Sequence, residues 1–468
     1  MAGHNIENCD NVHNNTFKKN LSSWHVLGLS MADASPAMAV LLLTTGVFSI
    51  GGTAAIGSSI ILSVVVIMIA LTLAELSSLY PFSGGMYSLV SNALPKPLSW
   101  IAMFNLLIQG VVLPASFVLG VAEFLKDLFP GLQISSQIIA LIALTLVMII
   151  AIMSVEMGAW VTVGMVIIQV GVLLAVVGAA FVNPHQAFMD ITFNPTMLKD
   201  GVLVPVTLGV MITTLAPAFG VINGYDAVLG FAEELKGGPK VLANTVIKAA
   251  VLASVFILVP LIAGVIAAPN LVEFFGSDSP IVYSVKQAFG NQIGALITIG
   301  VIFALFNAAL SLFMYFSRVL YSTGRDKVWT PSINKLLSKL NKHSVPAAGV
   351  MVLFVPTTVL LFVSQLNWLI IFSGTVISVV YFFIGISGIM SRINNKHAER
   401  PYKMPLWPIP SLIVVLFTGF AIMTQETQYL VGELVLAILA LISYFFFSKI
   451  NMNTNKDNNE ISKTKGVI

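Results

Sequence analysis

The stretch that decides the fold is LGLSMADASPAMAVLLL, residues 27–43. It is apolar enough for a bilayer interior, yet Asp33-Ala34-Ser35-Pro36 interrupts it. Because Ser is a preferred N-cap and Pro is favoured at the first helical position, we expect a new half-helix to begin at Pro36. Its free N–H groups and positive dipole end would lie near the membrane centre and suit a carboxylate. The carbonyl groups that end the half before Asp33 suit an ammonium group.

The composition requires a lipid environment. Of the 468 residues, 57% are hydrophobic and 9% are charged, whereas an average soluble domain has about 25% charged residues. The formal net charge of +3 argues against nucleic acid as a partner. The single cysteine, Cys9, excludes an intramolecular disulfide and a cysteine metal cluster. We expect no cofactor.

Apolar stretches long enough to cross the membrane recur along the chain, since a crossing helix needs about 20 apolar residues. We predict an all-α integral membrane protein with 12 transmembrane helices. The predicted spans are 27–50, 54–79, 98–124, 134–153, 159–181, 203–235, 243–268, 290–321, 346–364, 368–391, 406–424 and 428–447. The polar ends, 1–23 and 448–468, are rich in Asn and Lys, and we expect both to be disordered.

The basic residues predict the orientation. With the N-terminus inside, twenty of the 23 Lys and Arg residues fall on the inner side, and only Lys126, Lys199 and Lys286 fall outside. Because cytoplasmic loops carry an excess of Lys and Arg, we place both termini in the cytoplasm. An even number of spans follows, as does a multi-pass location in the cell membrane. Residues 1–23 contain no cleavable signal peptide.

A second interruption lies five spans after the first. The sixth span, 203–235, would be roughly 50 Å long at 1.5 Å per residue, and FGVINGYD, residues 219–226, lies in its middle. Breaks in corresponding positions are the sequence pattern of an inverted-repeat transporter with a site at the bilayer midplane. The alternative is a pair of merely kinked helices.

The two breaks suggest a ligand and two ionisable groups. A zwitterion with its carboxylate and ammonium on one carbon fits two such helix ends, which predicts an amino acid. Asp33 is an ionisable residue at membrane depth, so we expect it to pair with a substrate amine or to carry a coupling proton. The alternative is that it only caps the following half-helix. Asp226 is interpreted in the same two ways.

Other polar residues within the spans are weaker candidates. Asn105 and Gln109 lie four residues apart, hence on one face of the third span, and Asn307 and Ser311 repeat this spacing in the eighth. Each pair either lines a cavity or bonds neighbouring helices, and we favour the second interpretation. The sequence contains neither a phosphate-binding Gly-x4-Gly-Lys-Ser/Thr loop nor a His-Glu-x-x-His zinc pattern.

Four stretches resemble the amino acid–polyamine–organocation permeases. They are Glu75 to Tyr87, Gly224-Tyr225-Asp226 with Glu233 to Lys236, Ser317 to Asp326, and Arg400 to Pro405. The resemblance covers roughly residues 24–448. It implies a LeuT-type fold, in which helices 1–5 (24–181) and 6–10 (203–391) form inverted repeats and helices 11–12 (406–447) follow. It also implies secondary active transport or exchange of an amino acid or amine.

The resemblance also implies where the substrate binds. Its backbone would meet Ala34, Ser35, Pro36 and Ala37 in the first break, and Phe219, Gly220, Val221, Ile222, Asn223 and Gly224 in the second. Many relatives have a Gly-Ser-Gly-like run at the first break, which is Ala34-Ser35-Pro36 here, and Phe219 is expected to serve as the aromatic gate. Some proton-coupled relatives have a Lys or Glu near Gln169, which cannot titrate, so a proton would need another carrier such as Asp33.

Three functions compete. The first is a permease that moves an amino acid or amine by alternating access, together with a proton or in exchange for another substrate. The second is a membrane sensor whose transporter-like pocket binds amino acids without moving them, although the short tails give a signalling partner little to bind. The third, an integral-membrane enzyme, needs a catalytic cluster at membrane depth that the sequence does not offer. We therefore expect a permease and no enzyme.

Overall fold

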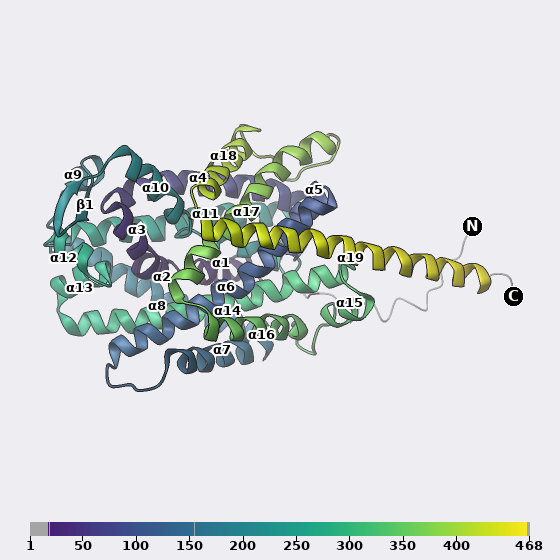
Figure 1. The fold of residues 1–468 in the computed structure, drawn as a ribbon, viewed down its shortest axis with the longest axis horizontal. Helices are drawn as coiled ribbons and strands as arrows, with labels where there is room; N and C mark the ends of the chain where they lie inside the picture. Colours follow the sequence, from purple (N-terminus) through teal and green to yellow (C-terminus); the bar gives the residue numbers. More distant parts are fainter. Residues whose placement is uncertain (1–16, 18, 154, 466–468) are drawn as a thin grey trace.

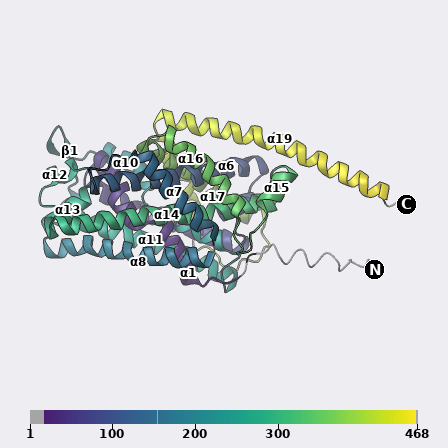
Figure 2. The same cartoon turned by 90° about the horizontal axis from the view of Figure 1, so that it is seen from below.

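The computed structural model describes residues 17, 19–153 and 155–465. The described chain is mainly helical, with one two-stranded sheet. Its long helices run side by side along one axis, and Figures 1 and 2 show α8, α11 and α14 lying lengthwise next to one another. Phe17, the first described residue, packs against Tyr321 near the end of α14, and the C-terminal part of α19 projects from the same end of the bundle. We call this the terminal end, and the other the distal end.

Nine helical segments in the described chain are long and apolar enough to cross a membrane. They are Ser23–Gly51, α4 (Ala54–Leu79), α6 (Lys96–Leu128), α7 (Ser136–Met153), α8 (Val155–Val182), α11 (Gly238–Ile266), α14 (Asn291–Arg325), α17 (Leu366–Asn394) and α19 (Thr427–Lys465). Two further apolar helices, α16 (Ala347–Val363) and α18 (Ile409–Met423), are shorter. Each predicted span except the sixth coincides with one of these segments. The count of twelve crossings stays a prediction.

The first span is interrupted at the predicted residue. It consists of α1 (Ser23–Ala34), α2 (Pro36–Met38), a π-helical turn η3 (Ala39–Leu43) and α3 (Thr44–Gly51). Between α1 and α2, Ser35 has the left-handed conformation, with φ 38° and ψ 66°. Pro36 has no N–H, so the helical ladder cannot continue through this point. The expected side-chain cap is absent, however, because the Ser35 hydroxyl makes no cap hydrogen bond to α2.

The prediction of one long sixth span over 203–235 was wrong at its start. Strands β1 (Thr196–Lys199) and β2 (Val202–Pro205) form an antiparallel hairpin, and the helix α10 (Leu208–Phe219) begins only after it. The turn is Asp200-Gly201, and both residues have positive φ, 50° and 79°. Asp-Gly is a strong signal for this type of tight hairpin turn, which explains why the chain pairs as strands here.

The rest of that span is broken as expected. After α10 the chain leaves the helix at Gly220, and Gly224 has φ 85°. The segment that follows is a 3₁₀-helix, η4 (Tyr225–Phe231), and not a continuation of the α-helix. Because glycine adopts positive φ without a steric penalty, Gly224 allows the chain to change direction inside the bundle.

The two breaks are in backbone contact. A Cβ atom at Gly224 would lie 2.6 Å from the Asp33 carbonyl carbon and 2.7 Å from the Ala34 Cα atom, too close for any side chain. The Ser30 hydroxyl, one turn before the first break, lies 3.2 Å from the Gly224 carbonyl oxygen and 3.0 Å from that of Tyr225, and donates to this pair. Carbonyl groups freed by one break are therefore satisfied by the other segment, as an apolar environment requires.

Both predicted tails are partly structured. Residues 1–16 lie outside the described residues, but Phe17 and Leu21 are buried, and Leu21 pairs with Leu235 in a parallel bridge. The prediction of disorder after residue 447 was wrong for the described part, since α19 continues to Lys465. Residues 448–465 contain neither Gly nor Pro, so no residue there strongly disfavours a helix.

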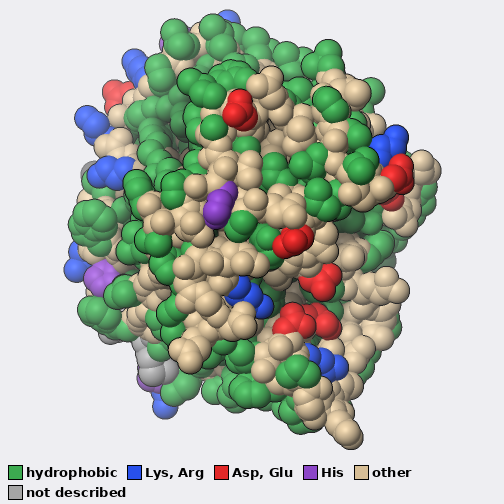
Figure 3. Space-filling model, turned by 90° about the vertical axis from the view of Figure 1, so that its left-hand side faces the viewer, with side chains coloured by type: hydrophobic (Ala, Val, Ile, Leu, Met, Phe, Trp, Pro, Cys, Tyr) green, Lys and Arg blue, Asp and Glu red, His purple; other side chains and the backbone are tan. Residues whose placement is uncertain are grey.

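The distal end is covered by short elements. These are α9 (Phe188–Phe193), the β1–β2 hairpin, α12 (Leu271–Gly276) and α13 (Pro280–Phe289). Figure 3 views this end and shows several acidic side chains gathered to the right of its centre. At the terminal end lie α5 (Gly85–Ala93) and α15 (Pro331–Leu337), as Figure 1 shows.

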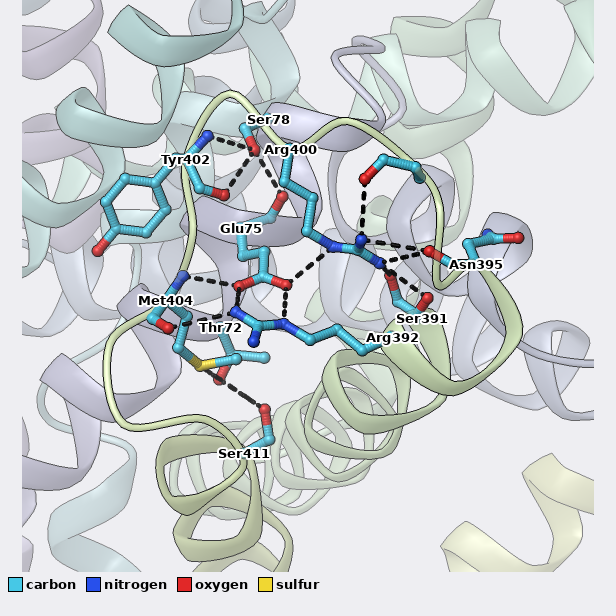
Figure 4. Close-up of polar contacts among 11 residues, drawn as sticks. Thr72, Glu75, Ser78, Ser391, Arg392, Asn395, Arg400, Tyr402, Met404 and Ser411 are labelled. Atoms are coloured by element: carbon cyan, nitrogen blue, oxygen red, sulfur yellow. Dashed lines mark hydrogen bonds and ion pairs between the residues drawn. The ribbon is translucent and has the colours of Figure 1, made fainter.

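Glu75 joins three segments near the end of α4 (Figure 4). Its carboxylate accepts hydrogen bonds from Arg392 Nε at 2.7 Å and Nη2 at 2.6 Å, and from the Met404 N–H at 2.7 Å. Arg400 Nε lies 3.1 Å from Glu75 Oε1. Since the Glu75 side chain is 3% exposed and that of Arg400 is 5% exposed, these charges are largely removed from water and depend on one another.

We predict that Gly224→Ala destabilises the protein, because Ala would strain the backbone and collide with Asp33 and Ala34. Backbone strain alone costs about 1–3 kcal/mol. The check is the melting temperature of detergent-purified protein. Gly57→Ala is the matched control, since Gly57 is helical and has open space around its Cβ position. Equal melting temperatures for the two variants would contradict this prediction.

We also predict that Glu75→Gln lowers the melting temperature, because two arginines would lose their shared counter-charge. Removing one partner of a buried ion pair typically costs about 3–5 kcal/mol. Glu399→Gln changes an exposed carboxylate in the same loop and should have little effect. If Glu75→Gln and the wild type have the same melting temperature, the Glu75 carboxylate contributes no net stability.

Candidate functional site

A cavity of about 910 Å³ lies where the two broken helices meet. Its inner part is lined by Asp33 and Ala34 from the first break and by Gly220, Asn223 and Asp226 from the second. Its outer part reaches the distal end, where the lining is formed by 275–278, at the end of α12, and by 424–426, between α18 and α19. The cavity thus connects the middle of the bundle with the face shown in Figure 3.

The charged residues in the cavity lining are all carboxylates. They are Asp33 and Asp226 at the inner end, and Asp278 and Glu426 near the opening. Among the residues that the structure describes, no Lys, Arg or His belongs to the lining. A cleft lined by charges of one sign attracts counter-ions from solution, so this cavity favours ligands that carry a positive group.

Asp33 lies at the inner end of the cavity without a protein partner. The residue is 7% exposed, and no described residue hydrogen-bonds its carboxylate, whose Oδ1 is completely buried. Buried polar atoms are nearly always paired, so an unpaired carboxylate oxygen facing a cavity is available to a ligand or a proton. The alternative, that Asp33 caps the following half-helix, finds no hydrogen bond to support it.

Asp226 takes part in a hydrogen-bonded group instead. The Tyr381 hydroxyl on α17 lies 3.0 Å from Asp226 Oδ1 and 3.0 Å from Asn223 Oδ1, and it can donate its one proton to either oxygen. Asn223 Oδ1 also accepts from the Gly224 N–H at 2.8 Å. Tyr381 therefore connects α17 to the second break.

The remaining predicted site residues divide into two groups. Ala34, Gly220, Val221, Asn223, Gly224 and Gln109 line the cavity, together with Asp33 and Asp226. Ser35, Pro36, Ala37, Phe219, Ile222, Asn105 and Asn307 are buried behind it and do not belong to its lining.

The second group makes contacts inside the protein. The Ser35 hydroxyl donates to the Ala304 carbonyl at 3.1 Å, and it also lies 3.3 Å from Gln169 Oε1. Phe219, the expected gate, is 2% exposed and packs edge-on against Tyr381, with ring centroids 5.7 Å apart. Asn105 donates to Glu433, and Asn307 donates to the Thr162 carbonyl. Both asparagines thus join helices, which was the favoured interpretation.

The sequence analysis missed three polar residues. Tyr381 and Glu433 were not considered, nor was Tyr315, which lines the cavity and whose hydroxyl is buried beside Asp226. The ring of Tyr315 fills space that Cβ atoms at Gly85 and Gly230 would occupy. Polar side chains inside apolar spans were the available signal.

The terminal end of the bundle is closed by ion pairs. Arg318 on α14 is 1% exposed, and its Nε lies 2.6 Å from Glu234 Oε1. Its guanidinium group also lies over the Phe231 ring at 4.4 Å. Arg325 Nη1 lies 2.7 Å from Glu233 Oε1. The cavity is therefore open at the distal end and sealed at the terminal end.

The N-terminal segment completes this seal. The Leu21 N–H donates to the Glu234 carbonyl at 3.0 Å, and the Lys236 N–H donates to the Leu21 carbonyl at 2.9 Å. Phe17 packs edge-on against Tyr321, with ring centroids 4.9 Å apart, and it lies 5.7 Å from the Arg318 guanidinium group. The chain before α1 is thus attached to the segment that follows η4.

Two similar proteins carry the same description. The branched-chain amino acid permease BcaP of Lactococcus lactis subsp. cremoris is 25% identical over 423 residues, which are 83% of this chain and 88% of that protein. The branched-chain amino acid permease BcaP of Bacillus subtilis is 24% identical over 446 residues, which are 89% and 91% of the two chains.

A third relative and a family model complete the comparison. The methylthioribose transporter of Bacillus subtilis is 24% identical over 313 residues, which are 61% of this chain and 64% of that protein. The model of the family described as amino acid permease matches residues 21–442. That match begins at the residue which pairs with Leu235 and extends into the last helix, so it includes both breaks and the cavity. The chain belongs to the amino acid permease family, a family of membrane transporters.

Proposed function

We propose that this protein carries amino acids across the cell membrane by alternating access. The observation that supports this most directly is the cavity between two broken helices, whose charged lining residues are all acidic. The ammonium group of the substrate binds beside Asp33. Its carboxylate lies at the first turn of the helical segment that starts at Pro36, where peptide N–H groups lack helical partners.

The substrate that fits best is a branched-chain amino acid. Two relatives are named as permeases for such substrates. Most of the lining between the breaks and the opening is apolar and includes Met38, Leu106, Leu312, Phe316 and Ile377. Burial of an aliphatic side chain contributes about 1.5–3 kcal/mol, so such a lining favours Leu, Ile and Val over polar amino acids.

The architecture that we propose is the LeuT type, with twelve spans and two inverted repeats of five. It places the substrate site at the crossing of the first and sixth spans, which is where the cavity lies. The distribution of basic residues supports a cytoplasmic terminal end, and the cavity then opens to the outside. In the inward-open state, the pairs Arg318–Glu234 and Arg325–Glu233 separate, and the N-terminal segment leaves Leu235.

Asp33 and Asp226 are the proposed coupling residues. Gln169 cannot titrate, and its side chain lies beside Ser35 behind the first break. Asp33 has no hydrogen-bond partner among the described residues, so in the empty protein a proton can neutralise it, and in the loaded protein the substrate ammonium can do so. This competition links the movement of protons to the movement of substrate. A sensor that binds without transporting receives no support from the relatives, which are named as transporters.

We predict that proteoliposomes containing the purified protein accumulate labelled leucine when a proton gradient is imposed. Excess unlabelled isoleucine or valine should reduce this uptake, whereas glutamate should not, because the cavity offers no basic side chain to a second carboxylate. Empty liposomes are the control. Binding of leucine without accumulation or exchange would identify a sensor instead.

We predict that Asp33→Asn abolishes proton-driven uptake while the protein stays folded, because a neutral amide neither takes up a proton nor pairs with the substrate ammonium as a carboxylate does. The measurement is uptake across a range of external pH, with melting temperature as the test of folding. Asp278→Asn changes an exposed carboxylate at the cavity opening and should retain pH-dependent uptake. Unchanged pH-dependent accumulation by Asp33→Asn would rule out a coupling role for this residue.

A further inference from the structure

Glu433 is a buried carboxylate that the proposed transport cycle does not use. It lies on α19, is 8% exposed, and does not belong to the cavity lining. Its Oε1 accepts a hydrogen bond of 2.8 Å from Asn105 Nδ2 on α6. The other oxygen, Oε2, is completely buried and has no hydrogen-bond partner among the described residues. The Asn105 Oδ1 atom is buried and unpartnered as well.

No basic side chain in the described chain pairs with Glu433. The helices packed against α19 are α6 and α17. On α6, Lys96 is nine residues from Asn105, about 14 Å along the helix, and Glu123, Lys126 and Asp127 lie near the other end. On α17, Tyr381 contacts Asp226, and Arg392 contacts Glu75. Besides Glu433, the titratable groups on α19 include Tyr429, Tyr444 and Lys449, and Glu426 immediately precedes the helix.

A carboxylate in these surroundings lacks both a counter-charge and a second donor. Burial of an unpaired charge among apolar helices is costly, and a proton removes that cost. The same proton supplies an O–H donor next to Asn105 Oδ1, an acceptor that has none. A single proton on Glu433 Oε2 would therefore neutralise the buried charge and also give Asn105 Oδ1 a hydrogen-bond donor.

We propose that Glu433 and Asn105 form a proton-binding site outside the substrate cavity, which takes up and releases a proton during the transport cycle. On uptake, a hydronium ion in the water-filled cavity transfers its proton to Glu433 Oε2, an O–H bond forms, and water remains. On release, that O–H bond breaks and the proton returns to water. The inference rests on the proposed transport function.

The position of this pair connects it to the cavity. Gln109 is four residues after Asn105 on α6, and Tyr429 is four residues before Glu433 on α19, and both line the cavity. Four residues correspond to about 6 Å along a helix. The unpartnered Gln109 Oε1 is a further buried acceptor at the cavity wall. A change in the packing of α6 against α19 during opening and closing alters the access of water to Glu433.

The test compares Glu433→Gln with Glu123→Gln, a change of an exposed carboxylate on α6, the helix that carries Asn105, outside the cavity lining. Gln keeps the shape and the hydrogen bonds of a protonated Glu but cannot release a proton. We expect Glu433→Gln to keep the exchange of labelled for unlabelled leucine without a proton gradient. Its gradient-driven accumulation should fall about tenfold, within the usual range of coupling free energies. Glu123→Gln should retain both activities.

A second measurement does not require transport. Substrate is added to detergent-solubilised wild type in weakly buffered solution, and the resulting pH change is recorded. The proposal requires this proton signal to become smaller in Glu433→Gln and to stay unchanged in Glu123→Gln. An unaltered proton signal in Glu433→Gln overturns it and leaves Glu433 with a fixed structural proton. If wild-type protein neither exchanges nor accumulates leucine, the proposed function fails, and the proton signal alone then decides the role of Glu433.

Discussion

The structure depends on the contact between Gly224 and the backbone at Asp33 and Ala34. Neither segment can continue as a helix at this point, since Pro36 lacks an N–H group and Gly224 has a positive φ. In a bilayer, each interruption alone would leave peptide groups unpaired at membrane depth. Because the two interruptions lie against each other, the hydroxyl of Ser30 can satisfy carbonyl groups of the second break. The absence of a side chain at Gly224 makes this approach possible.

The four sequence stretches that resemble the permease family meet at the terminal end. Ser83 and Glu233 exchange two hydrogen bonds, of 3.0 Å and 2.9 Å, which join the first stretch to the second. Arg325 joins the third to the second through Glu233, and Arg400 joins the fourth to the first through Glu75. These residues lie away from the cavity. Their common role is to hold together the end of the bundle that is closed in this conformation.

How far the sequence predicted the fold depends on the type of signal. The sequence located the break at Ser35 to the residue, because Ser-Pro is a pair of residues that is favoured where a helix begins. The hairpin at Asp200-Gly201 was missed, because a count of apolar residues assigns Leu203 to Pro205 to a span whether the chain is helical or extended. Hydropathy predicts how long an apolar segment is, whereas residues that favour tight turns, such as Asp-Gly, indicate whether the segment is helical or extended.

The candidate site was predicted less completely, for a reason that follows from helix geometry. Sequence spacing shows which residues share a face, as for Asn105 and Gln109, but it does not show which neighbour that face meets. Asn105 contacts Glu433, which is distant in sequence, whereas Gln109 lines the cavity. The role of Ser35 was also misjudged, since its hydroxyl bonds to Ala304 on α14 and not to the half-helix that it precedes.

The charge of the cavity restricts how a zwitterion can bind. No basic side chain among the described residues lines the cavity, so in the proposed binding mode the substrate carboxylate would depend on peptide N–H groups at a helix start, whose charge is fixed at every pH. The substrate ammonium would depend on carboxylates, which protons also bind. Protons would therefore compete with the ammonium group for Asp33 but would leave the carboxylate end of the site unchanged. Such a site would couple substrate and proton binding through Asp33 without a titratable group at the position of Gln169.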